Sequence, residues 1–159
     1  MEIKSVDLEF DEELKPLENP KNIIIHHTHN PELTLITTHK LHQEKFKWAG
    51  VGYNYLIEKD STIFEARGMY IGAHAKGHNA VAIGIALVGN FDEFLPSSEQ
   101  LELLIELCTY FMFKYDIEPN KVLGHRELEG VTKSCPGSKF NMDEFRELLK
   151  ISVSNNNII

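Results

Sequence analysis

Short apolar runs along the chain are typical of strands. Asn22–Thr28 contains three consecutive isoleucines, and Val81–Val88 is rich in β-branched and small residues, so both predict buried strands. Between them, segments 53–58 and 62–65 flank a polar turn at 59–61, a pattern that indicates a β-hairpin. The glycine inside the second buried run indicates that another part of the chain approaches its backbone closely.

Three longer segments place apolar side chains at the spacing of one helical face. Asn30 is expected to cap the first of them, with Pro31 at its first helical position. Ser97 and Gln100 match a capping box at the start of the second. The three predicted helices span about 31–47, 97–115 and 142–150.

The order of these elements predicts the fold class. Strands and helices do not alternate strictly, and Val122–His125 adds one more short strand, so we expect an α/β fold of the mixed α+β kind. In it, a central mixed β-sheet is flanked by about three helices. One domain is expected over 21–151, after an acidic arm at 1–20 that runs extended over the surface and before a flexible tail at 152–159. The Gly- and His-rich segment 69–79 is expected to be a loop.

Charge and hydropathy exclude several classes of partner. The formal net charge is -8, whereas nucleic-acid binders concentrate Lys and Arg, so no nucleic acid is expected to bind. The first residues lack the basic and apolar pattern of a secretory signal, which predicts synthesis in the cytoplasm without a signal peptide. The apolar runs are far shorter than the ~20 residues of a membrane span, so no membrane insertion is expected.

Candidate chemistry centres on two histidines and one cysteine. Zinc favours imidazole nitrogen and thiolate sulfur, and a catalytic site uses three protein ligands, which His26, His125 and Cys135 would supply. His27 is adjacent to His26 on a predicted strand, so the two side chains point to opposite faces and cannot readily share one ion. Spacing alone leaves a metal site and no metal site about equally supported.

The other histidines and Cys108 have structural interpretations, whereas Cys135 has a second possible role as a nucleophile. Cys108 lies on the apolar stripe of the second helix and is interpreted as a small buried residue. Cys135 could instead be a nucleophile with His125 as its base, an enzyme that a chelator would spare. Glu127 is near His125 in sequence and could orient a ligand, but it is interpreted as a solvated loop carboxylate. The histidines interpreted as surface, capping or packing groups are His29, His39, His42 and His78, with His42 on the inner face of its helix.

Five segments together resemble the zinc amidases that include the amidase-type bacteriophage lysozymes and the peptidoglycan recognition proteins. They follow the order and spacing of that family from Ile24 to Gly137, which makes chance similarity improbable. The segments are Ile24–Thr28, Gly50–Ile57, Gly72–Asn79, Ile83–Phe91, and Gly124-His125 with Lys133–Gly137. The resemblance implies a peptidoglycan recognition protein-like amidase fold.

The resemblance also implies a cofactor and a reaction. It identifies His26, the first histidine of the pair, as a ligand of one zinc ion that His125 and Cys135 complete. The implied reaction is hydrolysis of the amide bond between N-acetylmuramic acid and L-alanine in bacterial peptidoglycan. A phage or prophage endolysin that acts on the cell wall after its release, as a monomer, is the expected context. A non-catalytic peptidoglycan-binding module of the same fold is the alternative.

The same resemblance assigns roles to four further side chains. Tyr53 and Lys133 would be the catalytic groups beside the metal, Lys133 as a fixed positive charge and Tyr53 as a hydrogen-bonding partner. An unperturbed tyrosine titrates near about 10, so Tyr53 is a poor base at neutral pH. His74 and Asn79 match positions that line the substrate groove. Ser61 departs from the family, because a hairpin glycine is common there.

Overall fold

Residues 1–157 are described by a computed structural model, in which six strands form one sheet and three helices surround it. The strands are β1 (Ile3–Ser5), β2 (Asn22–His27), β3 (Tyr55–Ile57), β4 (Ile63–Glu65), β5 (Ala82–Leu87) and β6 (Val122–Gly124). The helices are α1 (Leu35–Glu44), α2 (Ser98–Tyr115) and α3 (Met142–Asn157), and short 3₁₀ turns cover Pro119–Lys121 and His125–Glu127.

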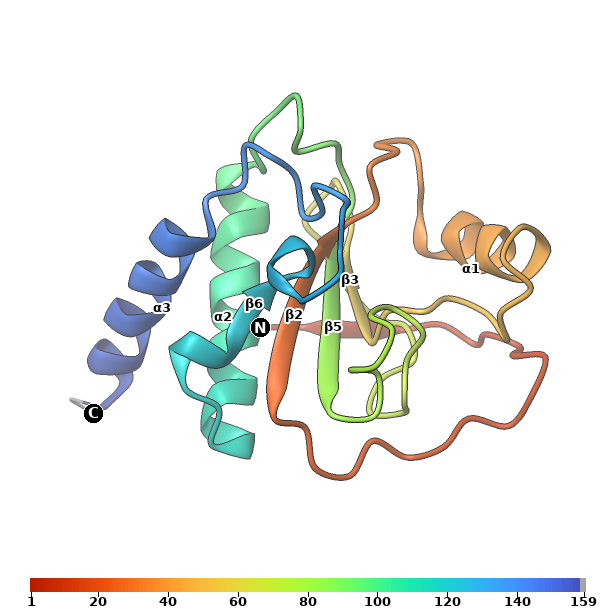
Figure 1. The fold of residues 1–159 in the computed structure, drawn as a ribbon, viewed down its shortest axis with the longest axis horizontal. Helices are drawn as coiled ribbons and strands as arrows, with labels where there is room; N and C mark the ends of the chain where they lie inside the picture. The colour runs from red at the N-terminus through yellow and green to blue at the C-terminus, as the bar shows by residue number, and fades with distance from the viewer. Residues whose placement is uncertain (158–159) are drawn as a thin grey trace.

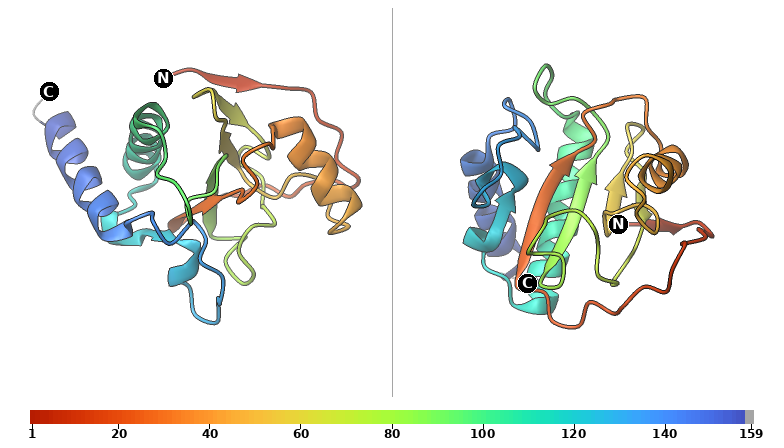
Figure 2. Two further views of the ribbon diagram at one scale, coloured as in Figure 1. Left: turned by 90° about the horizontal axis from the view of Figure 1, so that it is seen from above. Right: turned by 45° about the vertical axis from the view of Figure 1, so that its right-hand side comes forward.

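The sheet is mixed, and its order is β1-β4-β3-β5-β2-β6. Strands β3, β5, β2 and β6 run parallel, whereas β4 is antiparallel to β3, as the predicted hairpin requires. Helices α2 and α3 lie on one face of the sheet, and α1 lies on the side away from them (Figures 1 and 2). The predicted fold class is therefore confirmed.

The parallel strands bring the loops that carry the candidate ligands together at the carboxyl ends of the strands. Strands β2, β5 and β6 pair in parallel, so their carboxyl ends lie together, and these ends lead into the loops after His27, Leu87 and Gly124. Ligands in open α/β sheets bind outside the carboxyl ends of the strands. Each helix within residues 1–157 falls short of the length or apolar character that a membrane span requires.

The two faces of β2 have different neighbours. Ile23 and Ile25 belong to the main core, which includes the buried side chains of α2 and α3. Ile24 packs in a separate cluster with Ala75 and Leu128, on the other face of the sheet. Because side chains alternate along a strand, His26 lies on the face of Ile24 and His27 on the face of α2 and α3.

Helix α1 begins later than the sequence pattern predicted. The Asn30 side chain accepts from the backbone N–H of Glu32 and forms a local turn instead of a helix cap. Thr34 is the actual N-cap, in a capping box with Thr37. The prediction of a helix over 31–47 with Asn30 as its cap was therefore wrong at its start, because Asn30 satisfies a turn.

Helix α3 is longer than predicted, so the predicted end of this helix was wrong, whereas the flexibility of the tail at 152–159 stays a prediction. The helix continues to Asn157 instead of ending near Lys150. The Ser152 hydroxyl lies 3.0 Å from the Thr109 hydroxyl on α2, and Val153 packs against the core. These contacts with α2 stabilise a segment whose own sequence favours fraying. Residues 158–159 lie outside the described residues.

The N-terminal arm packs against the domain along much of its length. Its first residues form β1 at the sheet edge, parallel to β4, a strand that the sequence pattern did not predict. Further along, Phe10 packs edge-on against the His39 ring, with centroids 4.9 Å apart, and Leu17 is buried. The hairpin turn places Ser61 at φ 67°, which explains why a glycine is common at this position.

Candidate metal centre

The three predicted ligands converge at the carboxyl edge of the sheet. His26 lies near the end of β2, His125 follows β6 directly, and Cys135 lies in the loop between β6 and α3. One ligand atom from each lies within 4.8 Å of the others, and residues 1–157 contain one such group. The His26 and His125 ring centroids are 4.6 Å apart.

The geometry of this group fits zinc. The His26 Nδ1 atom lies 3.7 Å from the Cys135 Sγ atom. Tetrahedral zinc, with bonds of about 2.0 Å to nitrogen and about 2.3 Å to sulfur, separates two such ligands by ~3.6 Å. Two imidazoles and one thiol supply three ligands, of which His125 is partly exposed to solvent. A fourth position for water or substrate is characteristic of a catalytic zinc site.

Burial keeps the histidine ligands neutral. It lowers the pKa of His26 well below its usual value, and the neighbouring His74 and His125 lower it further. Burial also lowers the pKa of His125, with the positive charge of Lys133 as the next cause. Neutral imidazole carries the lone pair that a metal needs, so both rings can coordinate at neutral pH.

The Cys135 side chain is suited to a metal ligand rather than to a free nucleophile. Burial raises the pKa of its thiol to about 11, although the His27 backbone N–H and the Lys133 charge act in the opposite direction. That N–H donates to Sγ at 3.4 Å. A thiol with a raised pKa is a poor nucleophile, whereas a bound metal deprotonates it outright. The raised pKa of the thiol therefore disfavours Cys135 as the nucleophile of a cysteine–histidine hydrolase.

His27 has the packing role that the sequence predicted. It is buried on the face of α2 and α3, and its Nδ1 accepts from the backbone N–H of Phe91 at 3.1 Å. Burial lowers the pKa of His27 to about 4, so the ring accepts this bond in its neutral form. Among the other histidines, His42 is buried as predicted and accepts from the Gly52 N–H, and His39 is also buried.

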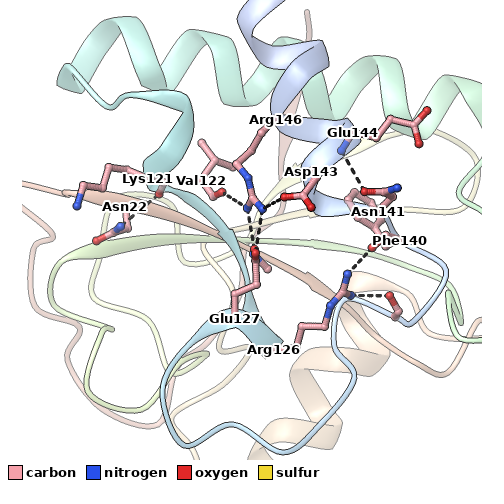
Figure 3. Close-up of polar contacts among 12 residues, drawn as sticks. Asn22, Lys121, Val122, Arg126, Glu127, Phe140, Asn141, Asp143, Glu144 and Arg146 are labelled. Atoms are coloured by element: carbon pink, nitrogen blue, oxygen red, sulfur yellow. Dashed lines mark hydrogen bonds and ion pairs between the residues drawn. The ribbon is translucent and has the colours of Figure 1, made fainter.

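The loop that carries Cys135 is held by the side chain next to a ligand. Arg126 donates through its backbone N–H to the Cys135 carbonyl at 2.7 Å. Its guanidinium donates to the Gly137 carbonyl at 2.6 Å and to the Phe140 carbonyl at 2.5 Å, the latter drawn in Figure 3. The sequence analysis missed this clamp, because its acceptors are backbone carbonyl groups, which carry no signal in a sequence.

A second arginine, Arg146, holds the 3₁₀ turn that contains His125. Arg146 on α3 makes two hydrogen bonds to the Glu127 carboxylate and one to Asp143 (Figure 3). Glu127 also accepts from the Gly124 backbone N–H at 2.8 Å. Glu127 is exposed, as predicted for a solvated loop carboxylate, but its contacts also join β6, the turn after it and α3, a role that the prediction did not include.

A glycine allows the Cys135 loop to approach the strand edge. Gly137 has φ 120°, and a Cβ at this position would lie 2.4 Å from the Phe91 carbonyl carbon. Close by, the Lys139 N–H donates to the Phe91 carbonyl at 2.8 Å. The loop thus joins the segment after β5 through backbone contacts.

Arg126→Ala is expected to lower the free energy of unfolding of the metal-free protein by about 2–3 kcal/mol. Hydrogen bonds from a charged group contribute about 1.5–3 kcal/mol, and the loop carbonyls would lose their donor. Urea denaturation measures this change. Lys150→Ala, which removes a surface ion pair with Glu147, serves as control and is expected to change stability by less than about 0.5 kcal/mol. Equal effects of the two substitutions would contradict the clamp.

Tyr53 lies beside the centre, and the charge of Lys133 acts on two of the ligands. The Tyr53 ring is half-buried, 5.3 Å from the His26 ring between centroids, and its hydroxyl makes no hydrogen bond within residues 1–157. Burial, reinforced by Cys135, raises the pKa of Tyr53 above its ordinary value, which disfavours a role as base. Lys133 is exposed, and its charge lowers the pKa of both His125 and Cys135. Their catalytic roles stay predictions.

His74 and Asn79 occupy the loop between β4 and β5, on the His26 side of the sheet. His74 is buried, with 7% of its surface exposed, and its ring packs at 5.0 Å from the His26 ring between centroids. The Asn79 side chain accepts from the backbone N–H groups of His74 and Ala75. Substrate binding by these two residues stays a prediction, and the structure gives both of them internal contacts.

Comparison with known proteins agrees with this site. The family model described as N-acetylmuramoyl-L-alanine amidase matches residues 16–138. The chain belongs to this family. Among solved amidase structures, the endolysin N-acetylmuramoyl-L-alanine amidase LysCS from Clostridium intestinale superposes with a TM-score of 0.86 at 33% identity, covering 96% of each chain. The matched range contains all three ligands of the amidase centre.

Two other relatives extend the comparison within the amidase family. A variant of Drosophila PGRP-LB, solved in complex with tracheal cytotoxin, has a TM-score of 0.76 at 27% identity, covering 87% of this chain and 89% of that one. The Sus scrofa N-acetylmuramoyl-L-alanine amidase is 31% identical over 143 residues, which cover 80% of this chain. The chain spans only 24% of that protein's length, and 54% of a second curated relative, Peptidoglycan-recognition protein LB.

Proposed function

We propose that this protein is a zinc-dependent hydrolase that cleaves the amide bond between N-acetylmuramic acid and L-alanine in peptidoglycan. The observation that carries the proposal is the convergence of His26, His125 and Cys135 in a chain of the amidase family. All three ligands come from one chain, which supports action as a monomer. The similarity to a Clostridium endolysin supports a role as a phage or prophage endolysin at the cell wall.

The metal and the side chains around it would have different roles in hydrolysis. When bound, zinc would supply Lewis acidity that activates water and polarises a carbonyl. Lys133, whose charge acts on the neighbouring His125, would supply a fixed positive charge to the oxyanion that develops on the substrate carbonyl. Preorganised electrostatic stabilisation of this kind dominates many hydrolases. The Tyr53 hydroxyl is available to donate a hydrogen bond that orients the attacking water or that oxyanion. Both groups act without changing their own protonation state.

Digestion of purified cell walls tests this proposal. The protein is expected to release amino groups from peptidoglycan without creating new reducing sugar ends, and treatment with a chelator is expected to stop the release. Metal analysis of the active protein should find about one zinc per chain, as a three-ligand catalytic site predicts. New reducing ends would indicate a glycosidase and contradict the proposal.

The alternatives give different results in the same assay. A peptidoglycan-binding module of this fold would sediment with cell walls and release nothing. A thiol hydrolase would release amino groups and keep its activity after chelation. The complete ligand set favours the zinc enzyme over the binding module, in which loss of a ligand, particularly the cysteine, would be expected. The raised pKa of Cys135 favours it over the thiol hydrolase.

A further inference from the structure

A buried histidine outside the ligand set contacts the ring of a ligand directly. The His26 Nε2 atom lies 2.9 Å from the His74 Nδ1 atom. The other nitrogen of the same ring, Nδ1, faces Cys135 Sγ at 3.7 Å. One ring edge of His26 is therefore directed at the metal position and the other at His74.

The surrounding backbone holds the His74 ring in one place. A Cβ at Gly84, in the middle of β5, would lie 2.5 Å from the His74 ring, and one at Gly72 would lie 2.7 Å from it. The Asn79 side chain fixes the His74 backbone N–H at 2.8 Å. The two glycines thus leave room for this ring, and the close backbone approach expected from the glycine in this strand is made by His74.

The hydrogen-bond partners of His74 determine which nitrogen carries its proton. Its Nε2 atom lies 3.4 Å from the Ala82 carbonyl oxygen, which can only accept. With the proton on Nε2, the His74 Nδ1 atom is an acceptor, so the His26 Nε2–H donates to it. That proton leaves the lone pair of His26 on Nδ1, the atom that faces Cys135.

We propose that His74 is a positioning residue of the metal centre, which holds His26 in the tautomer and ring orientation that present Nδ1 to the metal. Metal-binding histidines commonly donate their second N–H to a fixed acceptor, and removal of that acceptor typically costs 10–100-fold in metal affinity. The low exposure of His74, 7%, leaves little surface for substrate. The inference rests on the metal centre of the proposed function and not on the reaction.

Two substitutions separate the effect of the His74 hydrogen-bond acceptor from the effect of the volume of its ring. His74→Leu removes the acceptor but fills similar space, and zinc affinity is expected to fall by about 10–100-fold. His74→Asn places an oxygen on Cγ, where Nδ1 is attached in histidine, and is expected to recover most of the lost affinity. Competition with a chromophoric chelator measures the zinc dissociation constant without substrate.

A second buried histidine provides the matched control. His39 is 6% exposed, accepts from the Val51 N–H and contacts the Glu9 carbonyl, but it touches none of the three ligands. His39→Leu is expected to lower stability and to keep the wild-type zinc affinity. Wild-type affinity in His74→Leu, or no recovery in His74→Asn, would overturn the inference.

A measurement on the unaltered protein covers the case in which the variants do not fold. Long-range proton–nitrogen NMR spectra of the zinc-loaded wild type are expected to show His26 protonated on Nε2 and ligated through Nδ1. Ligation through Nε2 would overturn the inference, and so would a wild type that binds no zinc, which would also contradict the proposed function. Zinc bound in this way by a protein that leaves cell walls intact would contradict only the proposed reaction.

Discussion

Cys135→Ala is expected to release the metal and to lower wall-digesting activity by about 10³-fold or more. Loss of one of three ligands leaves two neutral imidazoles, a much weaker zinc site. A catalytic metal supplies several kcal/mol of transition-state stabilisation, and each 1.36 kcal/mol is a factor of ten in rate. Metal analysis of the purified variant and release of amino groups from cell walls measure the two effects.

The second cysteine of the chain is the control for this substitution. Cys108 is fully buried on α2, in the core on the face of the sheet away from His26. Cys108→Ala is expected to lower stability slightly and to keep both zinc and activity. A Cys135→Ala protein that still binds zinc with wild-type affinity would contradict the ligand assignment. Activity that survives chelation in the wild type but is lost in Cys135→Ala would indicate a thiol nucleophile.

Lys133→Met is expected to reduce turnover by about 10²–10³-fold while zinc stays bound. Methionine keeps much of the length of the side chain but removes the charge that we propose stabilises the developing oxyanion, and loss of one such group typically costs this much. The Lys133 charge lowers the pKa of His125 and Cys135, so we expect it to act also on a carbonyl bound beside these two residues. Digestion kinetics together with zinc analysis test this prediction.

Lys121 offers a matched control, because it lies at the end of β6 opposite to His125. It is exposed and directly precedes β6, whose other end leads to His125. Lys121→Met makes the same change in net charge, so a similar loss of activity in both variants would show a general charge effect. Loss of zinc from Lys133→Met would instead indicate a role in metal binding rather than at the substrate.

The local sequence pattern was sufficient to predict the elements whose boundaries depend on nearby residues. The hairpin of β3 and β4, the buried strand β5 and the start of α2 at its capping box agree with the sequence prediction. Each depends on side-chain alternation, helical spacing or a short-range hydrogen bond. The same cues failed at Asn30, because an asparagine before a proline can form a local turn as readily as a helix cap.

Other features depend on contacts between distant parts of the chain. The last turns of α3 are helical because Ser152 and Val153 meet α2, which the polar sequence of this segment does not reveal. The arm joins the sheet through β1, whose three residues pair with the free edge of β4. Arg126 clamps the Cys135 loop through carbonyl groups, which carry no signal in a sequence.

The sequence by itself determined the ligand types, the strands and loops that carry them, and that His26 and His27 face opposite ways. Only the tertiary structure showed which face of β2 meets His125 and Cys135, and that face belongs to His26. It also assigned His74 a contact with His26. The physical reason is that alternation along a strand is local, whereas the layer that covers each face depends on how the whole sheet packs.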